Sequence, residues 1–142
     1  MKKIQSASEE LKNIAKSKRI PNAILLSGNG KNKLRSALDF CKTILTEGEE
    51  GDRKLKLEKM CESYSHPDLH FIFPIPSSTK QVENRCDFYY NKWREALTEM
   101  GVELTMNKWI EKLDCGNKQP FIGVNSVEPL SQKLIISAFE KK

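Results

Sequence analysis

The sequence predicts an α/β fold, in which a parallel sheet is flanked by helices. Three observations lead to this prediction. A short uninterrupted apolar run at residues 23–27 is typical of a strand covered on both faces, the usual state in a parallel sheet, and residues 69–73 are a second candidate strand. Longer segments carry apolar residues at helical spacing. Finally, residues 20–45 read as a strand, a glycine-bearing loop and a helix in succession.

The first predicted element is a helix. Ser6 and Glu9 have the spacing of a capping box, in which the hydroxyl accepts from the first turn and the carboxylate reaches back. Ile20–Pro21 ends this helix, because the residue before a proline disfavours the helical conformation. Apolar residues recur at helical spacing before that point, at Ile4, Ala7, Leu11 and Ile14.

A strand, a loop and a second helix are predicted next. The apolar run Ala23–Ser27 stops at Gly28, and the polar residues 28–33 form a tight loop. An amphipathic stripe then predicts a helix over residues 34–45. Charged residues dominate 47–59, where a loop leads into a polar helix.

The second half of the chain repeats this alternation. A strand over residues 69–73 is closed by Pro74 and followed by a loop. Two amphipathic helices follow, and Thr105 is the predicted cap of the second. Residues 121–124 form a third strand, after which Ser126 caps a last helix with Pro129 in its first turn. The residues expected to face inward are Tyr89, Trp93, Ala96, Leu97, Met100, Met106, Trp109, Ile110, Leu113, Leu130, Leu134 and Ala138.

The composition is that of a globular chain. Of the 142 residues, 38% are hydrophobic and 30% charged, which argues against disorder. No apolar run has the length of a membrane span and no secretory signal follows Met1, so we expect a cytoplasmic protein without a membrane partner. The four cysteines show no C-x-x-C pair and are expected to be free thiols. The net charge of +5 is concentrated before residue 36, where nine Lys or Arg oppose two Glu.

The loop after the first strand is a candidate phosphate site. The working motif, G-x-x-x-x-G-K-[ST], wraps phosphates with backbone amides, meets them with Lys and holds magnesium with the hydroxyl. Counted from Gly28, the second glycine falls on Lys33, the lysine on Leu34 and the hydroxyl on Arg35. Three of the four defining positions therefore hold the wrong residue, and Ser36 lies one step too far. We expect no ATP hydrolysis here.

The same loop still offers groups that neutralise an anion. Its candidate cofactor-binding residues are Gly28, Gly30, Lys31 and Lys33, a degenerate phosphate loop that we expect to be inactive. Weak binding of a nucleotide or sulfate remains open, because the start of the following helix favours negative charge. No resident cofactor and no catalytic residue is predicted.

Other polar and aromatic residues have ordinary interpretations. His66 and His70 have no nearby Cys or third His, so a metal site is not expected. A set of aromatic residues could stack nucleic-acid bases. Its members are Trp93, Trp109, Phe88, Tyr89 and Tyr90. At helical spacing, a place in the core is the favoured interpretation. The histidines are too few to assemble a Ser-His-Asp or Cys-His arrangement.

An ordered set of short motifs resembles bacterial clamp-loader subunits of the AAA+ class. The segment Lys18–Gly28 is similar to the family's R-I-P-H-A-x-L-F-x-G, with Asn22 in place of His. Residues 66–69 read H-P-D-L, as in the family. Further matching pieces are Ala37–Cys41, Trp93–Leu97, Trp109–Leu113, Asn117–Val124, Lys133–Leu134 and Phe139–Glu140.

The resemblance points to the delta-prime subunit of the DNA polymerase III clamp loader. It implies a three-layer P-loop NTPase-like fold and an ATP-inactive subunit that acts as a scaffold. The implied partners are the other loader subunits and, through the complex, the sliding clamp and primed DNA. Residues 1–142 would be the N-terminal part of the AAA+-like domain, with the Walker B strand, sensor strands and lid absent and the parallel sheet incomplete. Residues 84–116 resemble a helical insertion of Bacteroidetes delta-prime subunits.

Two other functions stay open from the residues alone. One is an active P-loop nucleotide-binding protein that uses Lys31 or Lys33 in a divergent loop. The other is a small basic nucleic-acid-binding module, whose affinity would fall steeply with salt. Its basic residues would be Lys12, Lys16, Lys18, Arg19 and Arg35. A zinc module is not expected, since Cys61 alone lies where family members carry four cysteines.

Overall fold

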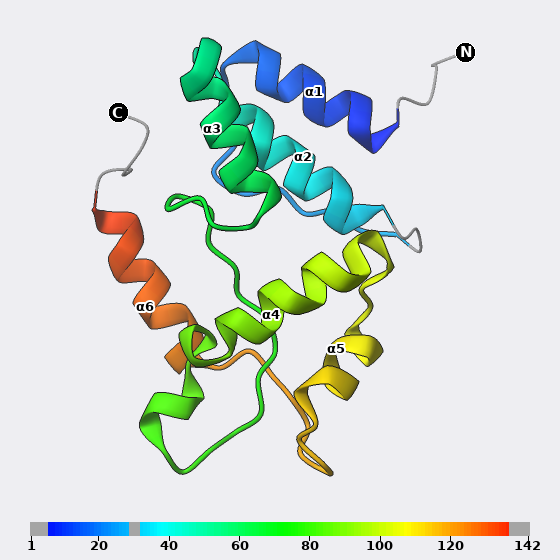
Figure 1. Cartoon of the computed structure of the whole chain (residues 1–142), viewed down its shortest axis with the longest axis vertical. Coiled ribbons are helices and arrows are strands. Elements are labelled where there is room, and N and C mark those ends of the chain that lie inside the picture. The colour runs from blue at the N-terminus through cyan, green and yellow to red at the C-terminus, as the bar shows by residue number, and fades with distance from the viewer. Residues whose placement is uncertain (1–5, 29–31, 137–142) are drawn as a thin grey trace. The chain divides into compact units, whose positions relative to one another are not determined.

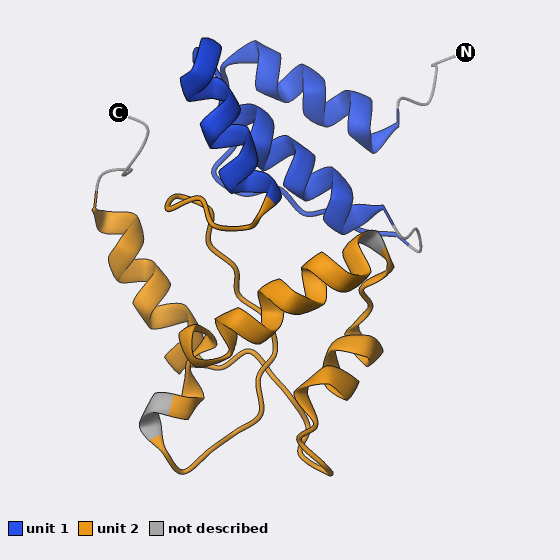
Figure 2. Ribbon diagram, viewed as in Figure 1, with its two compact units in different colours: residues 1–62 blue, residues 63–142 orange. Residues whose placement is uncertain are grey.

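The computed structural model of the chain describes residues 6–28 and 32–136. It divides into two compact units, Met1–Glu62 and Ser63–Lys142 (Figure 2). The helices of the first unit are α1 (Ala7–Ser17), α2 (Lys33–Leu45) and α3 (Gly51–Glu62) (Figure 1). Those of the second are η1 (Gln81–Asn84), α4 (Cys86–Met100), η2 (Gly101–Glu103), α5 (Met106–Leu113) and α6 (Val124–Ile135), where η marks a 3₁₀ helix.

The predicted α/β fold with a parallel sheet is wrong. Within the described residues the regular elements are all helices, and neither 23–27 nor 69–73 belongs to a strand. One antiparallel bridge joins Ile75 to Phe121, with N···O distances of 3.0 Å in both directions. The third predicted strand, 121–124, contributes Phe121 to this bridge, and its last residue already belongs to α6. An apolar run indicates that a segment is buried, but a strand also needs a neighbouring strand to pair with, and no local pattern identifies that partner.

The first unit consists of three helices packed in sequence order, α1 on α2 and α2 on α3. The predicted capping box is confirmed: Ser6 Oγ accepts from Glu9 N at 3.3 Å, and Glu9 Oε2 accepts from Ser6 N at 3.4 Å. The helix ends at Ser17, and Lys18 has a left-handed φ of 57°. Between α1 and α2 the chain is extended, and Leu25 is 89% exposed rather than covered on both faces.

In the second unit, helix side chains take the place of strand partners along the non-helical segment 63–77, which has turns at residues 63–64 and 67–68 before an extended part. Trp109 Nε1 donates to the carbonyl of Pro74 at 2.8 Å. Cys86 Sγ donates to the Phe73 carbonyl at 3.4 Å. The first part of the segment is bound in the same way, by Tyr90 Oη on Tyr64 O (2.6 Å) and by Arg94 on Ser63 O (3.0 and 3.2 Å). These bonds satisfy carbonyls that a sheet would otherwise pair.

An aromatic cluster forms the core of this unit. Phe73 is 1% exposed and stacks on Trp93 at 4.5 Å between ring centroids. Trp109, also 1% exposed, meets Phe73 edge-on at 5.2 Å and Trp93 at 5.0 Å. Edge-to-face and offset pairs of this kind add stability beyond area burial. The core interpretation is therefore confirmed for the two tryptophans and, as partly buried neighbours of the core, for Tyr89 and Tyr90. It is wrong for Phe88, which is 53% exposed.

Helices α4 and α5 lie where predicted, but Met106, expected to face inward on α5, is 53% exposed. Thr105 caps α5 as predicted, and its Oγ1 accepts from Lys108 N at 3.3 Å. Helix α6 begins three residues earlier than Ser126 would require as a cap, because Gly123 is its N-cap. Pro129 consequently lies inside the helix and not in its first turn. Leu134 is 70% exposed, against the prediction, and Ala138 lies outside the described residues.

The indole bond to Pro74 predicts unequal effects of two similar substitutions. Trp109→Phe removes the donor and leaves a carbonyl without its partner, whereas the Nε1 atom of Trp93 is buried without a partner among the described residues. Trp109→Phe should therefore destabilise the second unit by about 1–3 kcal/mol more than Trp93→Phe. Urea unfolding followed by the fluorescence of the remaining tryptophan measures both. Equal losses would contradict a structural role for the bond.

Candidate functional site

The predicted phosphate loop is only partly described. Gly28 ends the extended segment with a φ of 129°, and Lys33 is the first residue of α2. Lys33 Nζ donates to the carbonyl of Gly28, so the lysine closes the loop on itself. Gly30 and Lys31 lie outside the described residues. The structure thus places two of the four predicted residues together, through a contact internal to the chain.

At the positions where a working phosphate loop has its lysine and its hydroxyl, this chain has residues of other types. Leu34, where the phosphate-binding lysine would be, is half-buried and has no charge. Arg35, where the magnesium-binding hydroxyl would be, pairs with Asp39 one turn along α2, at 3.6 Å between Nε and Oδ2. These residues do not fit a magnesium-nucleotide complex, because neither the terminal phosphates nor the metal meets its usual partner.

A cavity of about 400 Å³ lies beside this loop within the first unit. Its walls come from one face of α1, from the extended segment and from the first turn of α2. The lining is largely apolar and includes Leu11, Ile14, Ile24 and Leu26, with Lys33 as its cationic group. Such a surface is better suited to contact with apolar groups than to binding a chain of phosphates.

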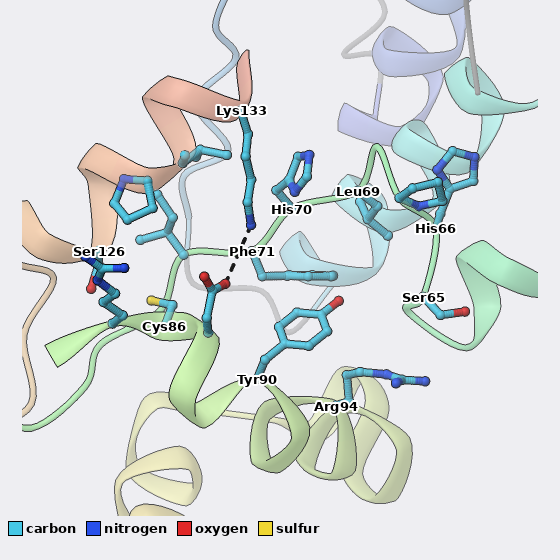
Figure 3. Close-up of a pocket in the computed structure, with 16 residues that line it drawn as sticks. Ser65, His66, Leu69, His70, Phe71, Cys86, Tyr90, Arg94, Ser126 and Lys133 are labelled. Carbon is cyan, nitrogen blue, oxygen red and sulfur yellow. Dashed lines mark ion pairs between the residues drawn. The ribbon is translucent and has the colours of Figure 1, made fainter. Parts of the chain in front are cut away.

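The second unit holds a more polar cavity, of about 370 Å³ (Figure 3). The extended segment forms one wall, the first turns of α4 another, and α6 the third. The bond between Arg94 and Ser63 O and the bond between Tyr90 and Tyr64 O help to fix the segment against α4. The polar side chains that line the cavity include Ser65, His66, His70, Arg85, Asp87, Arg94, Ser126 and Lys133.

Both histidines of the chain line this cavity. His66 is 2% exposed, and its Nδ1 accepts from Asp68 N at 3.1 Å. His70 is exposed to solvent. From the sequence we expected these residues in a turn and at a strand edge. Their common cavity could not be predicted, because one of its walls is α6, which follows more than fifty residues later. One feature of the sequence could have indicated the cavity, because both histidines lie within five residues of the same short segment.

The electrostatics of His70 are set by its surroundings. Partial burial, together with the Lys133 ammonium, lowers the pKa of His70 below its ordinary value of 6.5, while Asp68 and Asp87 oppose this shift. Lys133 itself pairs with Asp87, at 3.6 Å between Nζ and Oδ1 (Figure 3). Because the pKa of His70 is lower in the folded state, the unfolded chain protonates this imidazole at a higher pH than the folded chain does. The folded state is therefore destabilised relative to the unfolded state as the pH falls from 6.5 through the folded-state pKa.

Other predicted groups can also be placed. Lys12 and Lys16 are exposed on α1, and Lys18 and Arg19 are exposed just after it, so these four basic residues share one part of the first unit. The four cysteines are free thiols. In the described parts of the chain, no three His, Cys, Asp or Glu residues gather as metal ligands would. Across the same residues, no helix has the length and apolarity to cross a membrane.

The environment of His70 gives a prediction for its titration. Lys133→Gln removes a positive charge and leaves the Asp87 carboxylate unpaired, so the pKa of His70 should rise toward 6.5. Lys80→Gln is the matched control, because Lys80 pairs with Glu83 in the same unit, at 3.7 Å, but does not line the cavity. NMR titration of the imidazole signals measures both. An unchanged pKa of His70 in Lys133→Gln would contradict an effect of the Lys133 ammonium on this histidine.

Comparison with known proteins identifies one family. The family described as "DNA polymerase III, delta subunit" matches residues 3–142. No curated protein matches the chain, and no solved structure does. The match runs through both compact units, including the phosphate-loop region and the motif H-P-D-L. The chain therefore belongs to the DNA polymerase III delta subunit family, a family of clamp-loader-type proteins in DNA replication.

Proposed function

We propose that the chain acts as a delta-prime-type subunit of the DNA polymerase III clamp loader and does not hydrolyse ATP. The observation that carries the proposal is the family match over residues 3–142 in a chain whose phosphate loop is degenerate. Within a loader, a subunit without ATPase chemistry contributes shape: a fixed surface against a neighbouring ATPase subunit, which helps to open and load the sliding clamp at primed DNA.

The geometry of the loop supports an inactive site. A phosphate-binding lysine must be free to reach the anion, but Lys33 Nζ donates to the Gly28 carbonyl. A cation near the helix start is similarly engaged, since Arg35 pairs with Asp39. The first turn of α2 still favours an anion through its unpaired amides. That residual attraction supports weak nucleotide binding at most.

The proposal extends to partners, place and origin. The partners are the other clamp-loader subunits and, through them, the sliding clamp and primed DNA in the cytoplasm. Residues 84–116 are proposed to be a helical insertion of the kind found in Bacteroidetes delta-prime subunits. In support, α4 and α5 both fall inside this range and pack on each other.

The first test is calorimetric titration of the purified chain with magnesium-ATP at moderate salt. We expect no heat of binding in the micromolar range, with Lys33→Ala indistinguishable from the parent chain. Circular dichroism provides the control that both proteins are helical. Micromolar affinity that disappears in Lys33→Ala would instead establish an active nucleotide site.

The second test concerns assembly. The chain should co-elute in size-exclusion chromatography with the remaining clamp-loader subunits of its organism. The reconstituted complex should keep its DNA-stimulated ATPase rate, within about twofold, when this chain carries Lys33→Ala, because the hydrolysing sites lie on other subunits. Failure to co-elute would contradict the scaffold role. Binding of the isolated chain to DNA, weakening steeply with salt, would favour the basic-module alternative.

A further inference from the structure

The polar cavity of the second unit contains buried groups without partners. The Nε2 atom of His66 and the Oγ atom of Ser126 have no hydrogen-bond partner among the described residues. Both residues line the cavity, and they are 2% and 5% exposed. Buried polar atoms are nearly always paired in folded proteins, and each exception calls for an explanation.

The hydrogen bonding of His66 defines what its free atom needs. Nδ1 accepts from the Asp68 amide, and a ring nitrogen that accepts carries no proton. In the neutral ring the proton is therefore on Nε2, which is a donor that lacks an acceptor. Ser126 adds a hydroxyl that can also donate. The two groups together require an occupant rich in acceptor atoms.

The charges around the cavity specify the sign of that occupant. Three cationic side chains line it, Arg85, Arg94 and Lys133, against one carboxylate, Asp87. The excess is two positive charges (3 − 1), without any contribution from the histidines. Burial is the main cause of the depressed pKa of His70, and the Lys133 ammonium lowers it further. An anion would relieve this repulsion.

The size and shape of the cavity favour a small molecule. About 370 Å³ lies in the range of small-ligand pockets and is too little for a helix or a duplex. Figure 3 shows His66 and Ser126 on opposite sides of His70, Phe71 and Tyr90. The rings of Phe71 and Tyr90 lie 6.4 Å apart and offer apolar surface between the two polar ends. Arginine and lysine together are typical partners of phosphate.

We propose that the cavity formed by residues 65–72, α4 and α6 is a binding site for a small phosphate-bearing anion, whose phosphate is held at one end by Lys133, Arg85 and the Ser126 hydroxyl. The His66 donor, at the other end, is within reach of the remainder of a larger phosphorylated molecule. The site is separate from the degenerate loop, which belongs to the other unit. The shared chemistry is the phosphate group, whose source is either free phosphate or a phosphorylated small molecule. This site does not depend on the delta-prime assignment.

The histidines provide a direct probe, because the chain has only these two and both line the cavity. Imidazole NMR signals of the full chain are followed while inorganic phosphate, adenosine monophosphate or acetate is added at constant ionic strength. We expect saturable shifts with both phosphates and no saturation with acetate. Tighter binding of the monophosphate would identify a phosphorylated molecule as the source, and equal affinity would identify phosphate itself. Absence of saturable shifts with either phosphate overturns the proposal.

Three variants connect the binding to the named groups. Lys133→Gln should weaken phosphate binding about tenfold, the scale of one charge-assisted hydrogen bond. Ser126→Ala should also weaken it, while leaving thermal stability unchanged or raised, because the variant removes an unpaired buried hydroxyl. The control Lys80→Gln should bind like the parent chain. Equal affinities of the parent chain, Lys133→Gln and Ser126→Ala would overturn the site even if binding occurs elsewhere.

Discussion

The second unit depends on one constraint: an extended apolar segment is buried there without a sheet to pair it. Backbone carbonyls that lose water need hydrogen bonds, and around Phe73 they receive them from side chains of α4 and α5. The Trp109 indole is the central case, since it donates to Pro74 while its ring packs edge-on against Phe73. Pro74 suits this arrangement, because a proline offers a carbonyl but no amide hydrogen that would need a partner of its own.

The same constraint produces the polar cavity. Side chains alternate along an extended segment, so Leu69, Phe73 and Ile75 are buried while His70 between them faces outward. Covering such a segment with two helices leaves space where a neighbouring strand would have lain, and α4 and α6 bring their polar residues to its rim. A flat sheet would have closed this space with backbone bonds.

Local information in the sequence predicted local structure well. The capping box at Ser6, the Thr105 cap and the amphipathic stripes of α2, α4 and α5 each depend on residues within a few positions of one another. The prediction of a sheet was wrong because strand pairing joins distant segments, and an apolar run such as 23–27 does not indicate which segment would pair with it. The predicted start of α6 was wrong because Gly123 and Ser126 both make acceptable caps, and the helix begins after Gly123. The Ser126 hydroxyl could not be assigned to the cavity for that same reason.

The two candidate sites differ in how their polar groups are satisfied, and this difference separates their chemistry. In the loop of the first unit, the lysine that remains donates to a carbonyl of its own chain and the neighbouring arginine pairs with an aspartate, so an incoming phosphate would have to break existing bonds. In the cavity of the second unit Lys133 is also paired, with Asp87, but a buried donor on His66 and a buried hydroxyl on Ser126 lack partners among the described residues. Unpaired buried donors lower stability, whereas internally paired cations do not. A ligand in the cavity can therefore satisfy donors that the fold leaves unpaired, which the loop does not offer, although the loop is the segment with the motif-like sequence.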